Sequence, residues 1–253
     1  MIKKIVNLFM YVNIIFGFNF NFYKKEVMQS AYLSKICYLY NTNHNIIKQY
    51  KYLNEYNKSF YITDKKDNYL SIITYNKNKI NIAFRGTHNN NNLISNLYTS
   101  QKSFINNSIK VHSGYLNTYL SIREKIILII NNIIKYNKIN GFVISGHSLG
   151  GCIASLCSID LINYYKNKYD IRCYTFGSPK IGNNNFVIYY NSKVKYSFRF
   201  VNNRDIFSLY PPLPIYKHVG NVIKLSNINN NFNFNFIKYH QIDAYIKNIQ
   251  NKN

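Results

Sequence analysis

The sequence predicts an α/β fold in which one domain is built on a mainly parallel central sheet flanked by helices. Strand-like runs alternate with helical patterns along the chain, which is the pattern of parallel strands joined by crossover helices. The segment Gly141–Ser145 (GFVIS) is short and has no charged residue, as is typical of a strand buried on both faces. The 253 residues, 47% of them hydrophobic, suffice for one domain with a sizeable core, and no repeat or linker marks a second domain.

Residues 1–24 have features of a secretory signal peptide or a membrane anchor. Lys3 and Lys4 precede an apolar stretch that runs from Ile5 to Phe22. Asparagines interrupt this stretch and no small-residue cleavage site follows it, so an ordinary buried N-terminus is the alternative. The first interpretation places the protein outside the cell or in the ER lumen, and the second in the cytoplasm, associated with membranes. The folded domain is then expected to span residues 25–253.

The elements of this domain follow from the spacing of apolar residues along the chain. A helix is expected over Lys25–Tyr40, a polar loop over 41–58 and an Asn- and Phe-rich loop over Asn227–Phe236. Runs of helical length predict further helices at Tyr115–Tyr136, Leu149–Tyr165 and Gln241–Ile249. Short apolar runs predict strands at Phe60–Thr63, Leu70–Tyr75, Lys79–Phe84, Ile109–His112, Gly141–Ser145, Ile171–Phe176, Lys195–Val201 and Val219–Leu225.

The chain is strongly basic, with 32 Lys and Arg against 9 Asp and Glu and a formal net charge of +23. Asn, Ile, Lys and Tyr, which have A/T-rich codons, are abundant, whereas Gly, Pro and Trp are scarce, so we attribute much of the charge to codon usage. Nucleic-acid binders concentrate Arg on one face, but only five Arg are scattered along this chain, so no specific nucleic-acid binding is expected. A surface this positive is nevertheless attracted to anionic membranes.

The main chemical signal is Gly146–Gly151 (GHSLGG), which follows the GFVIS strand directly and precedes a predicted helix. A serine raised on a sharp strand-to-helix turn needs small neighbours, because larger side chains leave no room for the turn. The helix behind it offers free N–H groups to a developing oxyanion. This context predicts that Ser148 is a nucleophile, and a purely structural turn is the alternative.

Further segments make the chain resemble the fungal-type (class 3) lipase family of the α/β-hydrolase superfamily. The segments occur in the family's order and are Ile82–Thr87, Val111–Tyr115, Gly146–Gly151, Thr175–Asn183, Arg199–Asp205, Pro211–Pro214 and Tyr216–Gly220. The resemblance implies an α/β-hydrolase fold and hydrolysis of carboxylic esters of lipids, with triacylglycerol-type substrates, through an acyl-enzyme and without a cofactor. Together with the positive charge, it makes peripheral contact with an anionic membrane or lipid surface an expectation. The alternatives are a phospholipase or galactolipase with the same site, and a lipase-like binding protein without turnover.

The resemblance implies a Ser-Asp-His triad in that chain order. Asp205 follows a predicted strand end and matches the family's acid. Asp160 lies in the helix after the nucleophile, and Asp170 lies at the start of a strand, at the edge opposite the catalytic loops. A solvent-exposed turn residue is the alternative for Asp205.

Two histidines, His218 and His240, follow Asp205 and could supply the base. His240 comes after the last predicted strand, and the segment from His240 to Tyr245 resembles the family's His-x-x-acid-x-Tyr pattern. His218 matches a segment that is structural in relatives. We therefore expect His240 to be the base, with His218 as the alternative, and Asp243 to be an acid in the first turn of a helix.

The oxyanion hole is expected to use the backbone N–H groups of Leu149, the residue after the nucleophile, and of Thr87. A plain turn residue is the alternative for Thr87. The segment after Thr87 is where the family places its lid, although the family's Trp and its two acids are absent here. Leu93, Ile94 and Leu97 form a small apolar face there, which is either a lid candidate or a buried helix face.

The cysteines and histidines do not predict a metal site, since the chain has neither an HExxH motif nor a pair of CxxC motifs. The four Cys lie in predicted helices and a core strand, where small buried residues are common. Free thiols are expected, and disulfides are the alternative.

Overall fold

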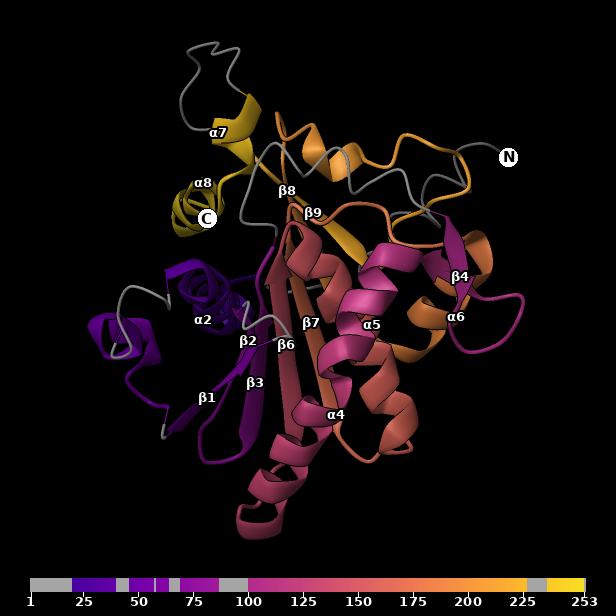
Figure 1. Ribbon diagram of the computed structural model, residues 1–253. Helices are drawn as coiled ribbons and strands as arrows, with labels where there is room; N and C mark the ends of the chain where they lie inside the picture. Colours follow the sequence, from indigo (N-terminus) through magenta and orange to yellow (C-terminus); the bar gives the residue numbers. More distant parts are fainter. Residues whose placement is uncertain are drawn as a thin grey trace, which may run out of the picture.

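The computed structural model describes residues 20–39, 46–56, 58–63, 69–86, 100–226 and 236–252, and a seven-stranded sheet runs through its centre (Figure 1). The strand order is β1-β2-β3-β6-β7-β8-β9. Three strands pair antiparallel at one edge, namely β1 (Lys58–Thr63), β2 (Tyr69–Tyr75) and β3 (Lys79–Phe84). The pairing from β3 onward is parallel, through β6 (Gly141–His147), β7 (Asp170–Phe176), β8 (Tyr196–Asn202) and β9 (Asn221–Leu225). This mainly parallel sheet confirms the predicted fold class.

Helices cover both faces of the sheet (Figure 1). On one face lie α4 (Ser113–Tyr136), α5 (Leu149–Tyr164) and α6 (Asn184–Lys193), and on the other lie α2 (Phe20–Leu39) and α8 (Ile242–Gln250). Side chains alternate along each strand, so Phe142 and Ile144 of β6 belong to the core under α4 and α5. Val143 between them joins the core under α2 and α8. This double covering explains why GFVIS has no charged residue.

All eight predicted strands are present, but several other expectations needed correction. The first helix begins at Phe20 rather than Lys25, and the polar loop contains two short 3-10 helices at Ile46–Gln49 and Lys51–Leu53. The strand predicted at 109–112 is β5 (Lys110–His112), which pairs with the unpredicted β4 (Gln101–Ser103) outside the main sheet. Phe236, predicted as loop, begins α7 (Phe236–His240). The rest of the Asn227–Phe236 loop lies outside the described residues.

The predicted signal or anchor segment lies almost wholly outside the described residues, and only 20–24 of it are described, at the start of α2. Lys24 there donates a hydrogen bond to the carbonyl oxygen of Lys252 at 2.9 Å. In the described ranges, no helix is long and apolar enough to cross a membrane. The four cysteines are buried and have free thiols, as expected.

Glu26 ties α2 to the sheet. Its carboxylate accepts hydrogen bonds from Lys79 on β3 at 2.6 Å, Tyr174 on β7 at 2.7 Å and Arg172 on β7 at 3.2 Å. Burial raises the pKa of Glu26, but the hydrogen bond and charge of Lys79, with Tyr174 and Arg172, outweigh burial and hold this pKa below its usual 4.5. A depressed folded-state pKa means that the charged carboxylate stabilises the fold above about pH 4.5, and this contribution is lost as the pH falls through the lower folded value.

Glu26→Gln should therefore lower the free energy of unfolding at pH 7 by about 1–3 kcal/mol, because bonds to a charged group are lost. The difference from wild type should be smaller at pH 3 than at pH 7, because the contribution of the charged carboxylate declines as the pH falls below about 4.5. Urea unfolding at both pH values measures it. Glu124→Gln is the matched control, because Glu124 pairs with Arg123 but its side chain is 81% exposed. An equal loss at both pH values would show that Glu26 contributes packing rather than charge.

Candidate active site

Ser148 occupies the turn between β6 and α5. Its backbone has φ 57° and ψ −129°, a left-handed conformation that is strained for a residue with a side chain. Two glycines make the turn possible: a Cβ on Gly146 would lie 2.1 Å from the carbonyl oxygen of Gly150, and a Cβ on Gly150 would lie 2.3 Å from that of Phe84. The turn thus presents Ser148 at the carboxyl end of the parallel strands, as the sequence predicts.

Ser148, His240 and Asp205 form a hydrogen-bonded line. His240 Nε2 lies 2.8 Å from Ser148 Oγ, and His240 Nδ1 lies 2.8 Å from Asp205 Oδ2. All three residues are buried, with 2–5% of their surface exposed, so little water competes for these bonds. Because a carboxylate only accepts, Nδ1 carries a proton in the neutral ring and Nε2 accepts from the serine hydroxyl. This arrangement can activate the serine for attack on a carbonyl carbon.

Tyr245 fixes the carboxylate and was not among the predicted site residues. Its hydroxyl donates to Asp205 Oδ2 at 2.5 Å and accepts from the N–H of Asn202 at 3.3 Å. The N–H of Phe207 donates to the other oxygen of Asp205 at 2.9 Å. Burial and the charge of Asp205 raise the pKa of Tyr245, so its phenol keeps its proton. The His-x-x-acid-x-Tyr pattern contained the signal. Asp243, its acid, forms an ion pair with Lys35 at 2.6 Å, away from the line.

His218 lies elsewhere. It forms a hydrogen bond to the backbone of Pro179, beside Arg199 and Lys180. Burial, together with the positive charges of Arg199 and Lys180, lowers the pKa of His218 to about 3. The structure therefore brings His240, and not His218, to the serine.

The other acids that follow Ser148 also lie away from it. Asp160 on α5 accepts from Tyr119 at 2.6 Å and from Arg123 at 2.7 Å. Asp170, at the start of β7, pairs with Arg172 at 3.1 Å. Asp160 thus joins α5 to α4, whereas Asp170 pairs within its own strand.

The predicted oxyanion donors are described in part. Leu149 is the first residue of α5, where N–H groups have no partner within the helix. Thr87 and the lid candidates Leu93, Ile94 and Leu97 lie outside the described residues. Gly86 is described and packs against the nucleophile, since a Cβ built on it would lie 3.0 Å from the Cβ of Ser148. The residues directly after β3 therefore reach the site.

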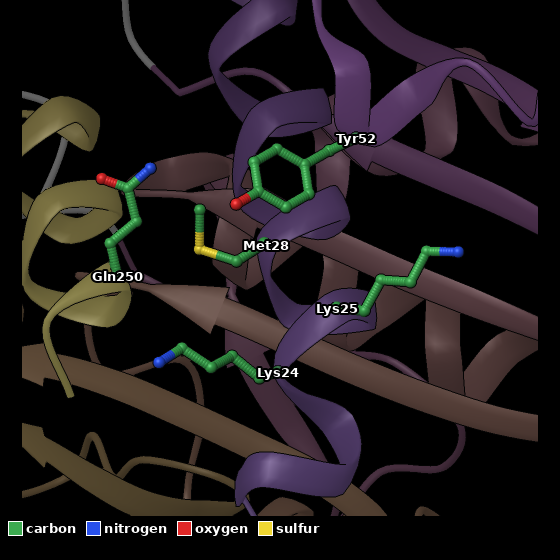
Figure 2. A pocket seen from close by; sticks show the side chains of 5 residues that line it. All are labelled: Lys24, Lys25, Met28, Tyr52 and Gln250. Carbon is green, nitrogen blue, oxygen red and sulfur yellow. The ribbon is translucent and has the colours of Figure 1, made fainter. Parts of the chain in front are cut away.

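A surface pocket of about 490 Å³ lies away from this constellation, at the start of α2 (Figure 2). Its lining residues are Lys24, Lys25, Met28, Tyr52 and Gln250. The pocket shares no residue with the hydrogen-bonded line, so we do not assign it to the same site.

Comparison with known proteins places this chain in a family. The model of the family described as "Lipase (class 3)" matches residues 81–214, just over half of the chain. A lipase of Rhizomucor miehei is 32% identical over 145 residues, which are 56% of this chain and 40% of the relative. Phospholipase A1-IIalpha of Arabidopsis thaliana is 32% identical over 115 residues, 40% of this chain and 27% of the relative. The alignments thus span about two fifths or less of these relatives.

Solved structures agree on the fold. A triacylglycerol lipase whose catalytic centre is described as a serine protease triad superposes with a TM-score of 0.69 at 24% identity, covering 81% of this chain and 80% of the other. Lipase II of Rhizopus niveus gives a TM-score of 0.69 at 20% identity, covering 82% and 80%. These likenesses confirm the α/β-hydrolase fold, and the family match confirms the resemblance seen in the motifs. The chain belongs to the class 3 lipase family.

Proposed function

We propose that this protein is a serine carboxylic-ester hydrolase that acts on lipid esters in the manner of a triacylglycerol lipase. The observation that carries the proposal is the line from Asp205 through His240 to Ser148 on a strained strand-to-helix turn. The names of several relatives, among them the Rhizomucor miehei lipase, support the lipid ester as substrate. No cofactor takes part in the proposed reaction.

In the proposed mechanism, Ser148 Oγ attacks the ester carbonyl carbon while His240 Nε2 takes the hydroxyl proton. Asp205 holds the ring and stabilises the imidazolium that forms. The N–H groups of Leu149 and Thr87 stabilise the negative oxygen, and each such donor contributes about 3 kcal/mol. His240 then gives its proton to the leaving alcohol, and the acyl group remains on Ser148. Water, deprotonated by His240, releases the fatty acid and restores the serine.

An apolar rim around the site supports contact with a lipid surface. Two segments next to the proposed catalytic residues expose large apolar side chains, with 37–60% of their surface accessible: Ile206, Leu209, Leu213, Ile215, Phe236 and Ile237. The first segment follows Asp205 and the second precedes His240, so both lie at the carboxyl end of the parallel strands (Figure 1). Exposed apolar patches of this kind mark surfaces that bind other molecules.

A phospholipase is the second candidate for the substrate class. One relative is a phospholipase A1, and the net charge of +23 favours lipids with anionic head groups. A secreted or ER-lumenal location is also part of the proposal. It rests on the cationic and apolar start of the chain and on the likeness to the Fusarium solani secreted mono- and diacylglycerol lipase 1, which is 28% identical over 146 residues.

The test of the proposal is hydrolysis by the purified wild-type protein. It should cleave p-nitrophenyl esters of graded chain length and should be labelled by a fluorophosphonate on the peptide that contains Ser148. Triacylglycerol emulsions compared with phospholipid vesicles then separate a lipase from a phospholipase. A folded protein that neither turns over any of these esters nor takes the label would be a lipase-like binding protein.

The apolar rim predicts where the protein meets lipid. Leu209→Ser should lower binding to phosphatidylcholine vesicles several-fold, because an exposed leucine side chain no longer enters the lipid. Leu128→Ser is the matched control: Leu128 on α4 is 63% exposed, like Leu209 at 60%, but lies outside the rim. Vesicle co-sedimentation measures both. Equal losses in the two variants would mean that the rim has no special role.

The charge of the same vesicles provides a further arm of this experiment. Adding phosphatidylglycerol should strengthen binding, and raising the ionic strength should remove the gain, because salt screens the attraction between lysines and anionic lipid. Binding that responds to neither change would make the positive charge a consequence of codon usage alone.

A further inference from the structure

A second series of hydrogen bonds reaches the active site from α2. The N–H of Gly86 lies 3.0 Å from Tyr38 Oη, and Tyr38 Oη lies 2.8 Å from His147 Nδ1. His147 Nε2 in turn lies 2.5 Å from the backbone oxygen of His240. This series of bonds therefore joins three positions around Ser148: Gly86 after β3, the end of β6 and the end of α7.

The chemistry of the groups determines which one donates and which one accepts in each of these bonds. The backbone oxygen of His240 only accepts, so His147 Nε2 must carry a proton. Burial and the neighbouring His240 hold the pKa of His147 well below its usual value, so the ring is neutral and Nδ1 has no proton. Nδ1 therefore accepts from the hydroxyl of Tyr38, whose pKa is raised by burial. The oxygen of Tyr38 is then free to accept from Gly86.

The fold holds the residues that make these hydrogen bonds in place. Tyr38 lies near the end of α2, which packs against β3 and β6 and is tied to the sheet by Glu26 near its start. A Cβ on Gly86 would lie 2.3 Å from Tyr38 Oη, so only glycine allows this approach. His147 is buried, and its ring also lies beside that of His240, with centroids 4.8 Å apart and ring planes tilted by 42°.

We propose that Tyr38 and His147 are positioning residues that set Gly86 and the His240 segment relative to Ser148. Neither side chain transfers a proton in the reaction. Tyr38 places Gly86, the residue before the proposed oxyanion donor Thr87, and His147 holds the backbone of the base. The inference rests on the proposed function and adds α2 to it, a helix that lies before the residues matched by the family model.

Tyr38→Phe tests the first link, because it removes one hydroxyl and keeps the ring. We expect kcat for a soluble p-nitrophenyl ester to fall about 10- to 100-fold, since small displacements of reacting groups carry costs of that size. KM should stay within about twofold, because the change affects alignment rather than ground-state binding. Rates are expressed per active site, titrated with a fluorophosphonate. Tyr32→Phe is the matched control: the same helix loses a hydroxyl whose partner is Gln250, and kcat should not change.

Two substitutions of His147 separate its two bonds. Gln places an N–H near the position of Nε2 and can keep the bond to His240, whereas Asn places an oxygen near Nδ1 and can keep the bond to Tyr38. We expect His147→Gln to retain more of the phosphonylation rate than His147→Asn, because the base stays in place. Adding Tyr38→Phe to His147→Gln should then lower the phosphonylation rate by a smaller factor than Tyr38→Phe does in wild type. The reason is that the bond that orders Tyr38 is already weakened in His147→Gln.

The outcomes distinguish this inference from the proposed function. If wild type hydrolyses the ester and labels at Ser148, but Tyr38→Phe keeps kcat within twofold, the positioning role is wrong and the function stands. A fall in melting temperature without a fall in kcat per titrated site also overturns it, because Tyr38 would then act on stability alone. If wild type neither hydrolyses nor labels, the proposed function itself fails.

Discussion

Ser148→Ala should abolish ester hydrolysis and fluorophosphonate labelling while the protein stays folded. The substitution removes the only group in the line that can form a bond to the substrate carbon. In serine hydrolases the loss of the nucleophile costs about 10⁶ in kcat, and what remains comes from the oxyanion hole and substrate binding. We therefore expect activity at or below the detection limit on p-nitrophenyl esters.

Stability should change little in this variant. Alanine and serine are equally strained at the φ of 57° that the turn imposes, so the backbone is not affected. One hydrogen bond to His240 is lost, which is typically a matter of about 1 kcal/mol. Thermal unfolding measures this effect. Ser192→Ala is the matched control, because Ser192 is exposed on α6 and bonds only its own helix at Tyr189.

Two results would contradict the assignment of Ser148. Labelling that persists in Ser148→Ala and maps to another serine would move the nucleophile. Hydrolysis that persists without any labelling would mean that the reaction does not pass through an acyl-serine at all. An unfolded variant is recognised by its circular dichroism, and Ser148→Cys, which keeps a nucleophile of similar size, then serves for labelling with a thiol reagent instead.

The acidic residues show why part of the site could be predicted from sequence. The part of the chain that the structure describes contains seven Asp and Glu, and each forms an ion pair. Six of them pair with Lys or Arg, whereas Asp205 pairs with a histidine. In so basic a chain an acid usually has a Lys or Arg nearby to pair with. An acid that pairs with His240 instead therefore differs from all the other described acids. The few acids also left little choice among candidates.

The residues that sequence analysis missed act through contacts far apart in the chain. Tyr38 and His147 are 109 residues apart, and Tyr245 and Asp205 are 40 apart. No local pattern links Tyr38 to His147, and with 26 tyrosines in the chain nothing singles Tyr38 out. Tyr245 was signalled only by the His-x-x-acid-x-Tyr pattern, which does not name Asp205 as its partner. The helix α6 was missed for a local reason. Its sequence NNFVIYYNSK lacks a clear apolar stripe, and only Phe186 and Tyr190 of it are buried.

The turn around Ser148 and the strands were predicted correctly from sequence, because their physical requirements are met by residues close together in the chain. The turn around Ser148 needs small residues within a few positions, and GHSLGG supplies them in order. The strand before it must be apolar because α2 and α5 cover its two faces. The choice between His218 and His240 was harder to predict from sequence than the turn, because it depends on which strand is last in the sheet. The structure places β9 between them, with His240 beyond its end.

His240→Ala should reduce kcat by about 10⁴-fold or more, whereas His218→Ala should leave kcat within a few-fold of wild type. His240 is the only residue that bonds both Ser148 and Asp205 in the described structure, so its loss leaves the serine hydroxyl without a proton acceptor. His218, with a pKa lowered to about 3, is neutral at the pH of the assay and too weakly basic to take a proton efficiently.

The two variants should also differ in labelling and in stability. His240→Ala should slow fluorophosphonate labelling of Ser148, because phosphonylation needs the same activated oxygen. His218→Ala should label at the wild-type rate but unfold at lower temperature, since the buried ring and its bond to Pro179 are lost. Kinetics per titrated site, labelling time courses and thermal unfolding are measured on both. If His218→Ala loses turnover and labelling while His240→Ala keeps them, the base is His218, and the bonds from His240 to Ser148 and Asp205 serve only to hold α7 against the sheet.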